Sequence, residues 1–415
     1  MLDMGFTLTA RLGIVGLASV LMAACAQVPI PQGQRASAPT SPQARTAASA
    51  TPASTASGRA NSTPKHKRVN CSDLVEMLSP AEQVGQLLMV AVRSTGLRQF
   101  ERDALAASRA GSVILLGNSF AGAAATRRVV TDARRSTPPA EGIETLMAVD
   151  QEGGKVQRLR GPGFAEIPPA EQQAERSDAR LAADAERWGD DLAAVGIGAN
   201  LAPVADVVSA DLAEKNAPIG YLRRGYGSSP RTVAAKATAF ARGMDRAGMA
   251  TAVKHFPGLG RVRGNTDYAR RVVDDQTRRD DPNLAPFAAA VDGGVDMVMA
   301  SSAFYDKIDQ ERRAAFSPVV LGDMLRGELG FTGVVISDDL AAEAMADVDP
   351  AQRALRFLGA GGDLMIIGDP GLVAPMVRAV RQQMSDDEQF AERVRQSATR
   401  VVALKARRGL ATCAR

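Results

Sequence analysis

Val334-Val335-Ile336-Ser337-Asp338 is a short apolar run that ends in polar residues. A continuous apolar run without alternating polar positions is typical of a strand that is covered on both faces, as in parallel sheets. Seven further runs of this kind recur between segments of helical pattern. They lie at residues 87–92, 112–117, 146–150, 199–204, 250–255, 297–302 and 363–368.

The segments between these runs carry helix signals. Ser79-Pro80-Ala81-Glu82 offers a capping serine, a proline at the first helical position and a glutamate three residues after the cap. Ser228-Ser229-Pro230 opens a long amphipathic stretch, and residues 386–407 read as a closing helix. Eight strands alternating with helices predict an α/β fold, a (β/α)₈ TIM-type barrel, as a single domain. An open doubly wound sheet is the alternative, but its usual glycine fingerprint is absent after Val92.

The first 25 residues have the pattern of a secretion signal. Arg11 precedes an apolar stretch at residues 12–22, which is too short to cross a bilayer as a helix but suits a signal-peptide core. The stretch ends in Ala23-Ala24-Cys25, and small residues before a cysteine resemble the bacterial lipoprotein signal. We therefore expect lipidation of Cys25, which would anchor the protein to a membrane of the cell envelope, outside the cytoplasm. The alternative is an ordinary cleaved signal with an incidental cysteine.

Residues 26–70 consist mainly of Ala, Ser, Thr, Pro and Gln, with almost no large apolar side chain. Such a segment cannot bury enough surface to offset its chain entropy, so we expect a disordered tether before a folded domain at residues 71–415. If Cys25 carries lipid, Cys71 and Cys413 remain as a pair, one at each edge of that domain. A barrel brings its two ends together, so we predict a Cys71–Cys413 disulfide; two free thiols are the alternative.

The composition argues against a nucleic-acid partner. The formal net charge is only +4 over 415 residues, and aromatic residues make up 4%. A nucleic-acid-binding protein normally shows a basic stripe with aromatic residues beside it, and the basic residues here are spread along the chain.

Charged residues follow three of the expected strands, where a barrel places its chemistry. The strand ends read Val149-Asp150-Gln151-Glu152-Gly153-Gly154, Lys254-His255-Phe256-Pro257-Gly258 and Ser337-Asp338-Asp339. Each has a plainer explanation, because Asp150 could cap a turn and Asp338 could cap a helix. Lys254 is harder to explain in this way, since a buried lysine needs a partner. Together the three ends favour a functional site.

The same segments, extended to Arg158 and Leu340, resemble glycoside hydrolase family 3, above all its single-barrel β-N-acetylglucosaminidases. The resemblance implies a retaining glycosidase that uses no cofactor or metal and acts as a monomer on glycans or muropeptides in peptidoglycan recycling. It implies that Asp338 is the nucleophile. The residues that it implies for sugar binding are Asp150, Arg158, Lys254, His255 and Arg224, with Arg223 as the neighbouring choice.

The resemblance does not extend to the family's acid/base residue. The family places a histidine on the loop after strand five, with an aspartate two residues before it. Here Asp267 stands at the histidine position and Asn265 at the aspartate position, and the chain has only two histidines, His66 and His255. We therefore expect Asp267 to act as the acid, with a hydrogen bond from Asn265, on a loop that its glycines allow to close. His255 is the reserve candidate.

Other functions remain open at this point. Without the dyad, the protein could be an envelope sugar-binding lipoprotein that has lost turnover. A phosphorylase could use phosphate as acceptor to offset a weak acid. A barrel that binds a phosphate-bearing cofactor rests only on Gly368-Asp369-Pro370-Gly371, which is more simply a turn.

Overall fold

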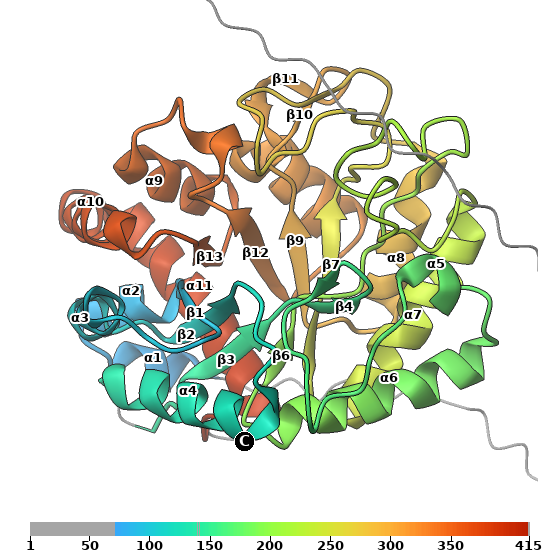
Figure 1. Cartoon of the computed structure of the whole chain (residues 1–415). Coiled ribbons are helices and arrows are strands. Elements are labelled where there is room, and N and C mark those ends of the chain that lie inside the picture. The colour runs from blue at the N-terminus through green and yellow to red at the C-terminus, as the bar shows by residue number, and fades with distance from the viewer. Residues whose placement is uncertain (1–70, 139, 141, 414–415) are drawn as a thin grey trace, which may run out of the picture. The chain divides into compact units, whose positions relative to one another are not determined.

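The computed structural model describes residues 71–138, 140 and 142–413. Within them, eight parallel strands close into a barrel in the order β1-β13-β12-β9-β7-β6-β3-β2 (Figure 1). The predicted barrel is confirmed, and closure excludes the open sheet. All eight predicted runs form its strands: β1 Leu88–Arg93, β2 Ser112–Leu116, β3 Leu146–Val149, β6 Ala199–Asn200, β7 Ala250–Phe256, β9 Met297–Ala300, β12 Val334–Asp339 and β13 Leu364–Ile367.

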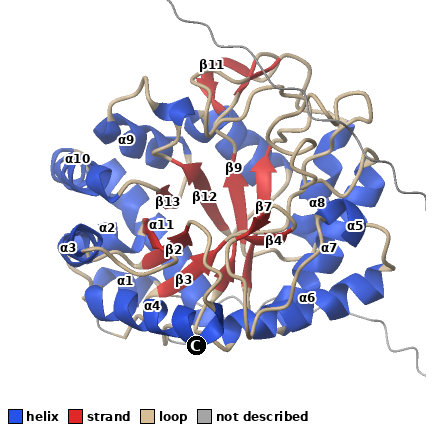
Figure 2. Ribbon diagram, in the orientation of Figure 1, coloured by secondary structure: helices blue, strands red, loops and turns tan. Residues whose placement is uncertain are grey.

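Helices form a ring outside the barrel strands (Figure 2). The predicted capping box is present at Ser79, whose side chain accepts from the Glu82 amide. The expected closing helix is preceded by a separate helix, and Asp387 caps the break by accepting from the amides of Gln389 and Phe390.

The α-helices are α1 Ser72–Glu76, α2 Pro80–Gln86, α3 Gln99–Ser108, α4 Gly122–Ser136, α5 Ala170–Gln173, α6 Asp178–Ala193, α7 Pro230–Arg246, α8 Ala285–Asp292, α9 Pro350–Ala360, α10 Val373–Asp386 and α11 Glu388–Arg407. A π-helix, η3 Val319–Glu328, follows β9, and short 3₁₀ turns are η1 Pro282–Leu284, η2 Ala314–Phe316, η4 Glu343–Met345 and η5 Pro370–Leu372.

Two small sheets, which the sequence did not predict, lie outside the barrel. β4 Gln151–Gly153 and β5 Val156–Gln157 form an antiparallel pair directly after β3. β8 Val273–Asp274, β10 Phe304–Tyr305 and β11 Asp309–Arg313 form a three-stranded sheet. Both sheets are built from segments that follow the carboxyl ends of barrel strands, so they belong to the end of the barrel where a site is expected.

The barrel interior is a separate apolar cluster. Alternate residues of the strands point inward, among them Met89, Ala148 and Ile336. Val401 and Leu404 of α11 belong to the same cluster, so the last long helix packs against the barrel interior. The larger cluster fills the space between the strands and the surrounding helices, which explains why the strands are apolar on both faces.

Cys71 and Cys413 are joined by a disulfide, the pair expected from the sequence, across a separation of 342 residues. The expected signal peptide at residues 1–25, the lipidated Cys25 and the tether at residues 26–70 lie outside the described residues. No helix of the described part combines the length and the apolar composition needed to cross a membrane.

Candidate active site

A cavity of about 540 Å³ opens at the carboxyl ends of the barrel strands. Its walls come from the strand ends and from the segments that follow β3, β6 and β7. Register shifts occur in β7 between Lys254 and Phe256 and in β12 between Ile336 and Asp339, where irregular pairing can redirect side chains. All seven residues that the sequence placed in a site line this cavity: Asp150, Arg158, Arg224, Lys254, His255, Asp267 and Asp338.

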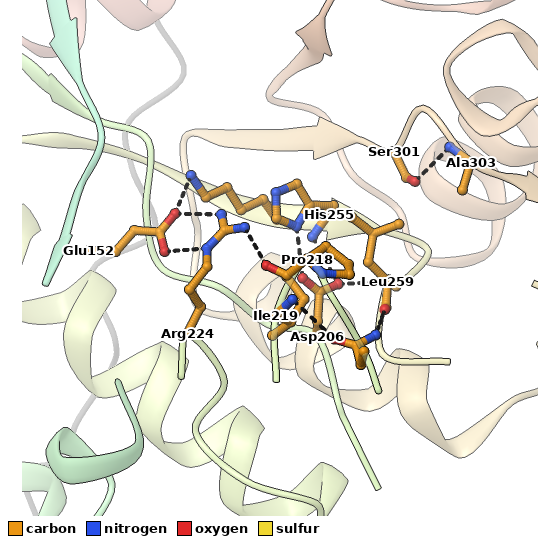
Figure 3. A network of polar contacts seen from close by, with 12 residues as sticks. Glu152, Asp206, Pro218, Ile219, Arg224, His255, Leu259, Ser301 and Ala303 are labelled. Atoms are coloured by element: carbon orange, nitrogen blue, oxygen red, sulfur yellow. Dashed lines mark hydrogen bonds and ion pairs between the residues drawn. The ribbon is translucent and has the colours of Figure 1, made fainter. Parts of the chain in front are cut away.

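Lys254 is the buried lysine for which the sequence required a partner, and it has two. Its Nζ lies 2.7 Å from Asp150 Oδ1 and 2.7 Å from Glu152 Oε1. Arg224 holds Glu152 with two parallel bonds, from Nε at 2.8 Å and from Nη2 at 2.7 Å (Figure 3). Arg224 also donates to the Pro218 carbonyl at 2.8 Å. This buried network fixes both cations before any ligand enters.

The charges in this network stabilise one another. Burial alone would raise the pKa of Glu152, but Arg224 and Lys254 outweigh it and hold that pKa well below its usual range. Burial would likewise lower the pKa of Lys254, and the carboxylates of Asp150 and Glu152 reverse that effect, so its pKa is raised. Lys254, Arg224 and Glu152 therefore stay ionised. The sequence places Glu152 in the strand-end motif, two residues after Asp150, but does not by itself assign it a role.

Arg224, and not Arg223, is the arginine that enters the site. Arg223 has a positive φ of 58° and pairs with Glu171 at the surface. This backbone turn directs the two neighbouring side chains to different surroundings. Arg158 reaches the cavity as well, and its Nη1 donates to Asn118 Oδ1 at 3.3 Å.

His255 is oriented by Asp206, a residue that the sequence analysis did not single out. Asp206 Oδ2 lies 2.7 Å from His255 Nδ1, and Asp206 Oδ1 accepts from the amides of His255 at 3.2 Å and Leu259 at 2.7 Å (Figure 3). An ionised carboxylate at Nδ1 favours the tautomer that carries its proton there, which leaves Nε2 as an acceptor. Asp206 follows β6, so a charge just after the fourth strand is the sequence signal that marks it.

Asp338 lies at the end of β12, where its Oδ1 accepts from the Asp339 amide at 2.9 Å. Asp338 does not cap a helix, contrary to the plainer explanation, because the next helical turn begins after Ala342. The Ser337 hydroxyl accepts from the Ile366 amide of β13 at 2.9 Å. Asp339 accepts from the amides of Ala341 and Gly368, both at 2.8 Å. Gly368 therefore uses its amide within the protein, and the segment that follows it is a turn capped by Asp369, as expected.

Asp267 lies on the loop after β7, at the rim of the cavity. Desolvation, first, and the nearby carboxylate of Asp338, second, raise the pKa of Asp267; Arg224 and His255 act in the opposite direction. The hydrogen bond expected from Asn265 to the acid is not formed: Asn265 Oδ1 instead accepts from the Asp267 backbone amide at 2.9 Å. Asn265 therefore shapes the turn and does not contact the carboxyl group.

The glycines of this loop differ from one another. A Cβ on Gly260 would lie 1.8 Å from the Val207 carbonyl oxygen, so Gly260 is required for close packing and not for movement. Gly258 has a positive φ of 132°, and a Cβ there would meet only the Phe287 ring, at 4.0 Å. Closure of the loop stays a prediction that rests on Gly258 and Gly264.

The described residues contain no group of three side chains placed to hold a metal ion. The cavity instead combines paired carboxylates with fixed cations and an oriented histidine, which suits the binding of a polyhydroxylated ligand and acid/base chemistry on it.

Residues 80–404 match the family described as glycosyl hydrolase family 3 N terminal domain. The chain belongs to glycosyl hydrolase family 3. A curated relative named beta-hexosaminidase, from Stenotrophomonas maltophilia, is 36% identical over 308 residues, which are 71% of this chain and 87% of that protein. A second beta-hexosaminidase, from Methylococcus capsulatus, is 36% identical over 293 residues, which are 68% of this chain and 83% of that protein.

A solved structure supports the same membership. The β-N-acetylhexosaminidase of Beutenbergia cavernae is 46% identical, superposes with a TM-score of 0.78, and covers 79% of this chain and 99% of its own. The predicted membership of family 3 is thus confirmed, and the match spans nearly all of the barrel.

Proposed function

We propose that this family 3 protein is a retaining β-N-acetylhexosaminidase that acts on cell-wall-derived glycans. Asp338 is the nucleophile and Asp267 the acid/base. One observation carries the proposal: Asp338 and Asp267 share a cavity in which the neighbouring cations Lys254 and Arg224 are already engaged by other carboxylates. The names of the relatives from S. maltophilia and B. cavernae support the choice of glycone.

A retaining glycosidase needs an ionised carboxylate at the anomeric carbon and a proton donor at the leaving oxygen. The raised pKa of Asp267 lets it keep its proton at a pH where a free aspartate would have lost it. Asp338 then bonds to the anomeric carbon as the glycosidic bond breaks, and Asp267 protonates the departing oxygen. In the second step, water transfers a proton to Asp267 and attacks the same carbon, which releases Asp338.

The fixed residues would bind the sugar in this scheme. Asp150, with one oxygen on Lys254, and the Nε2 acceptor of His255 are suited to hydroxyl donors. Arg158 and Lys254 are suited to hydroxyl or carbonyl acceptors. Because these groups are held by the protein before binding, little order has to be created when the ligand enters.

The test is hydrolysis of an aryl β-N-acetylglucosaminide by wild type, Asp338→Ala and Asp267→Asn. We expect Asp338→Ala to lose at least about a thousandfold in kcat, and Asp267→Asn to lose about 10²–10⁴-fold together with the alkaline limb of the pH profile. The limb is lost because the raised pKa of Asp267 sets the pH above which the acid is deprotonated. Asp275→Asn, an exposed aspartate outside the cavity, is the matched control.

A 5-fluoro glycoside should add one glycosyl mass to wild type, on the peptide that contains Asp338. An unchanged protein mass after long incubation, together with full activity of Asp338→Ala, would reject the nucleophile.

A sugar-binding protein without turnover is the second candidate. It is favoured because, within the described residues, no group donates a hydrogen bond to the Asp267 carboxyl oxygens. Calorimetric binding of N-acetylglucosamine with no release of an aryl leaving group would select it. Faster turnover in phosphate than in a non-phosphate buffer would instead indicate a phosphorylase.

We propose an envelope location with a lipid on Cys25, on the strength of the Ala23-Ala24-Cys25 motif. The Cys71–Cys413 disulfide supports a site outside the cytoplasm, where such bonds persist. Labelling with radioactive palmitate should mark wild type and not Cys25→Ser. Equal labelling of the two proteins would reject the anchor.

A further inference from the structure

Exposed aromatic side chains gather at the mouth of the cavity. The chain has four tyrosines, and the two buried ones are Tyr226 and Tyr305. The other two, Tyr221 and Tyr268, both line the cavity and are 62% and 82% exposed. A large ring left in water beside a cavity is typical of a binding surface that is completed by a ligand.

Tyr268 directly follows the proposed acid on the same turn. The amides of Tyr268 and Ala269 donate to the Asn265 carbonyl at 3.1 and 2.9 Å, and the Asp267 amide donates to Asn265 Oδ1 at 2.9 Å. Three hydrogen bonds to one residue fix the backbone of this turn. The position of the Tyr268 backbone is therefore tied to that of Asp267.

The exposure of the residues that line the cavity indicates where each half of a substrate would bind. The side chains of Lys254 and Asp150, which bind the glycone in the proposed function, are only 3% and 15% exposed. The acid must reach the oxygen between glycone and leaving group, so the leaving group lies outward from Asp267, towards the mouth. Tyr268, the residue after Asp267, lines the same cavity and is 82% exposed, which places it towards the mouth.

The two tyrosines of the mouth are not equivalent. The Lys155 ammonium lies 4.7 Å from the centre of the Tyr221 ring and donates to the Tyr221 carbonyl at 3.3 Å. A cation thus already occupies one face of Tyr221. Among the described residues, no ring or cation stacks on Tyr268, so its faces are open to a ligand.

We propose that Tyr268 is a specificity-determining residue whose ring stacks on the leaving group, and that this subsite takes a pyranose ring. The inference rests on the proposed function for the direction of the substrate. An apolar sugar face against an aromatic ring gains dispersion contacts and removes both surfaces from water. A small leaving group gains neither, so the site selects glycans whose leaving group is itself a sugar.

The test compares ligands that share the glycone and differ in the second ring. Full-length wild type and Tyr268→Ala are titrated with N-acetylglucosamine and with a sulfur-linked, non-hydrolysable N-acetylglucosamine disaccharide. We expect Tyr268→Ala to weaken binding of the disaccharide roughly tenfold and to leave monosaccharide binding within about twofold. Tyr268→Phe should bind like wild type, because stacking needs the ring and not the hydroxyl. Phe100→Ala, which removes an exposed ring outside the cavity, is the control.

Turnover gives a second readout. Tyr268→Ala should lower kcat/KM for diacetylchitobiose roughly tenfold and leave hydrolysis of N-acetylglucosaminyl fluoride, which has no leaving-group ring, nearly unchanged. An equal loss on both substrates would mean that Tyr268 only supports Asp267, and would overturn the inference.

The binding arm separates this inference from the proposed function. If no substrate is hydrolysed but disaccharide binding depends on Tyr268, the proposed hydrolase function is rejected and the Tyr268 subsite is supported. A disaccharide that binds wild type no better than the monosaccharide, or a lack of binding by either, overturns the subsite.

Discussion

Two neighbouring arginines form ion pairs with glutamate in opposite environments. Arg224 and Glu152 are 11% and 6% exposed, whereas Arg223 and Glu171 are 50% and 59% exposed. Removing one partner from a buried pair leaves an uncompensated charge, while an exposed pair is screened by water. We predict that Glu152→Gln lowers the free energy of unfolding by about 3 kcal/mol and that Glu171→Gln changes it by less than about 1 kcal/mol. Urea denaturation of both variants measures this, and equal effects would contradict the assigned role of the network.

Asp339 gives a pH-dependent prediction at the same scale. Burial, first, and the carboxylates of Asp338 and Asp267 raise the pKa of Asp339 to about 6, although amides of Ala341 and Gly368 act against this. Because the folded protein then binds the proton more tightly than the unfolded chain, the stabilisation from Asp339 is complete below its ordinary pKa of 3.8 and is lost as the pH rises through about 6.

Asparagine at position 339 keeps an acceptor for both amides and does not titrate. The free energy of unfolding of Asp339→Asn, relative to that of wild type, should therefore increase by about 2 kcal/mol from pH 4 to pH 7. Chemical denaturation at several pH values checks this. Parallel curves for the two proteins would show that Asp339 does not titrate in this range.

At the scale of elements, periodicity predicted the barrel strands and helix starts because apolar runs and caps are local features. β11, with the sequence Asp309-Gln310-Glu311-Arg312-Arg313, has no apolar residue and forms only because Phe304 and Tyr305 of β10 pair with it. Such a strand depends on a tertiary partner, so no local pattern could predict it.

The site shows the same division between local and tertiary information. Asp150, Lys254 and Asp338 were found because each ends an apolar strand. The pairing of Lys254 with Glu152 and of His255 with Asp206 joins residues far apart in sequence, and only the closed barrel decides it. The residues at strand ends are therefore the ones that reach the mouth of the cavity. Only the tertiary structure shows which of them are already paired with another side chain of the protein.

At the scale of the whole molecule, the candidate active site and the closing helix α11 lie at opposite ends of the barrel. The cavity lies at the carboxyl ends of the strands, whereas α11 contacts their amino ends. Lys405 of α11 donates to Gln86 Oε1 and to the Gly111 carbonyl, both at 2.6 Å, just before β1 and β2. The disulfide joins Cys71, directly before α1, to Cys413, which follows α11.

This separation predicts that the disulfide affects stability and not activity. The bond closes a loop with a sequence separation of 342 residues, and a long closed loop restricts the unfolded chain strongly. We expect the double variant Cys71→Ser, Cys413→Ser to lose about 2–4 kcal/mol in the free energy of unfolding. Its kcat/KM at 25 °C should stay within about twofold of wild type, because neither cysteine lines the cavity.

Denaturation and kinetics on the same preparation distinguish the two effects, and wild type treated with a reductant should match the variant. If the variant stays folded at 25 °C but loses activity, the two ends of the barrel are coupled, and Val401 and Leu404 are the α11 side chains that reach the apolar cluster of the barrel interior.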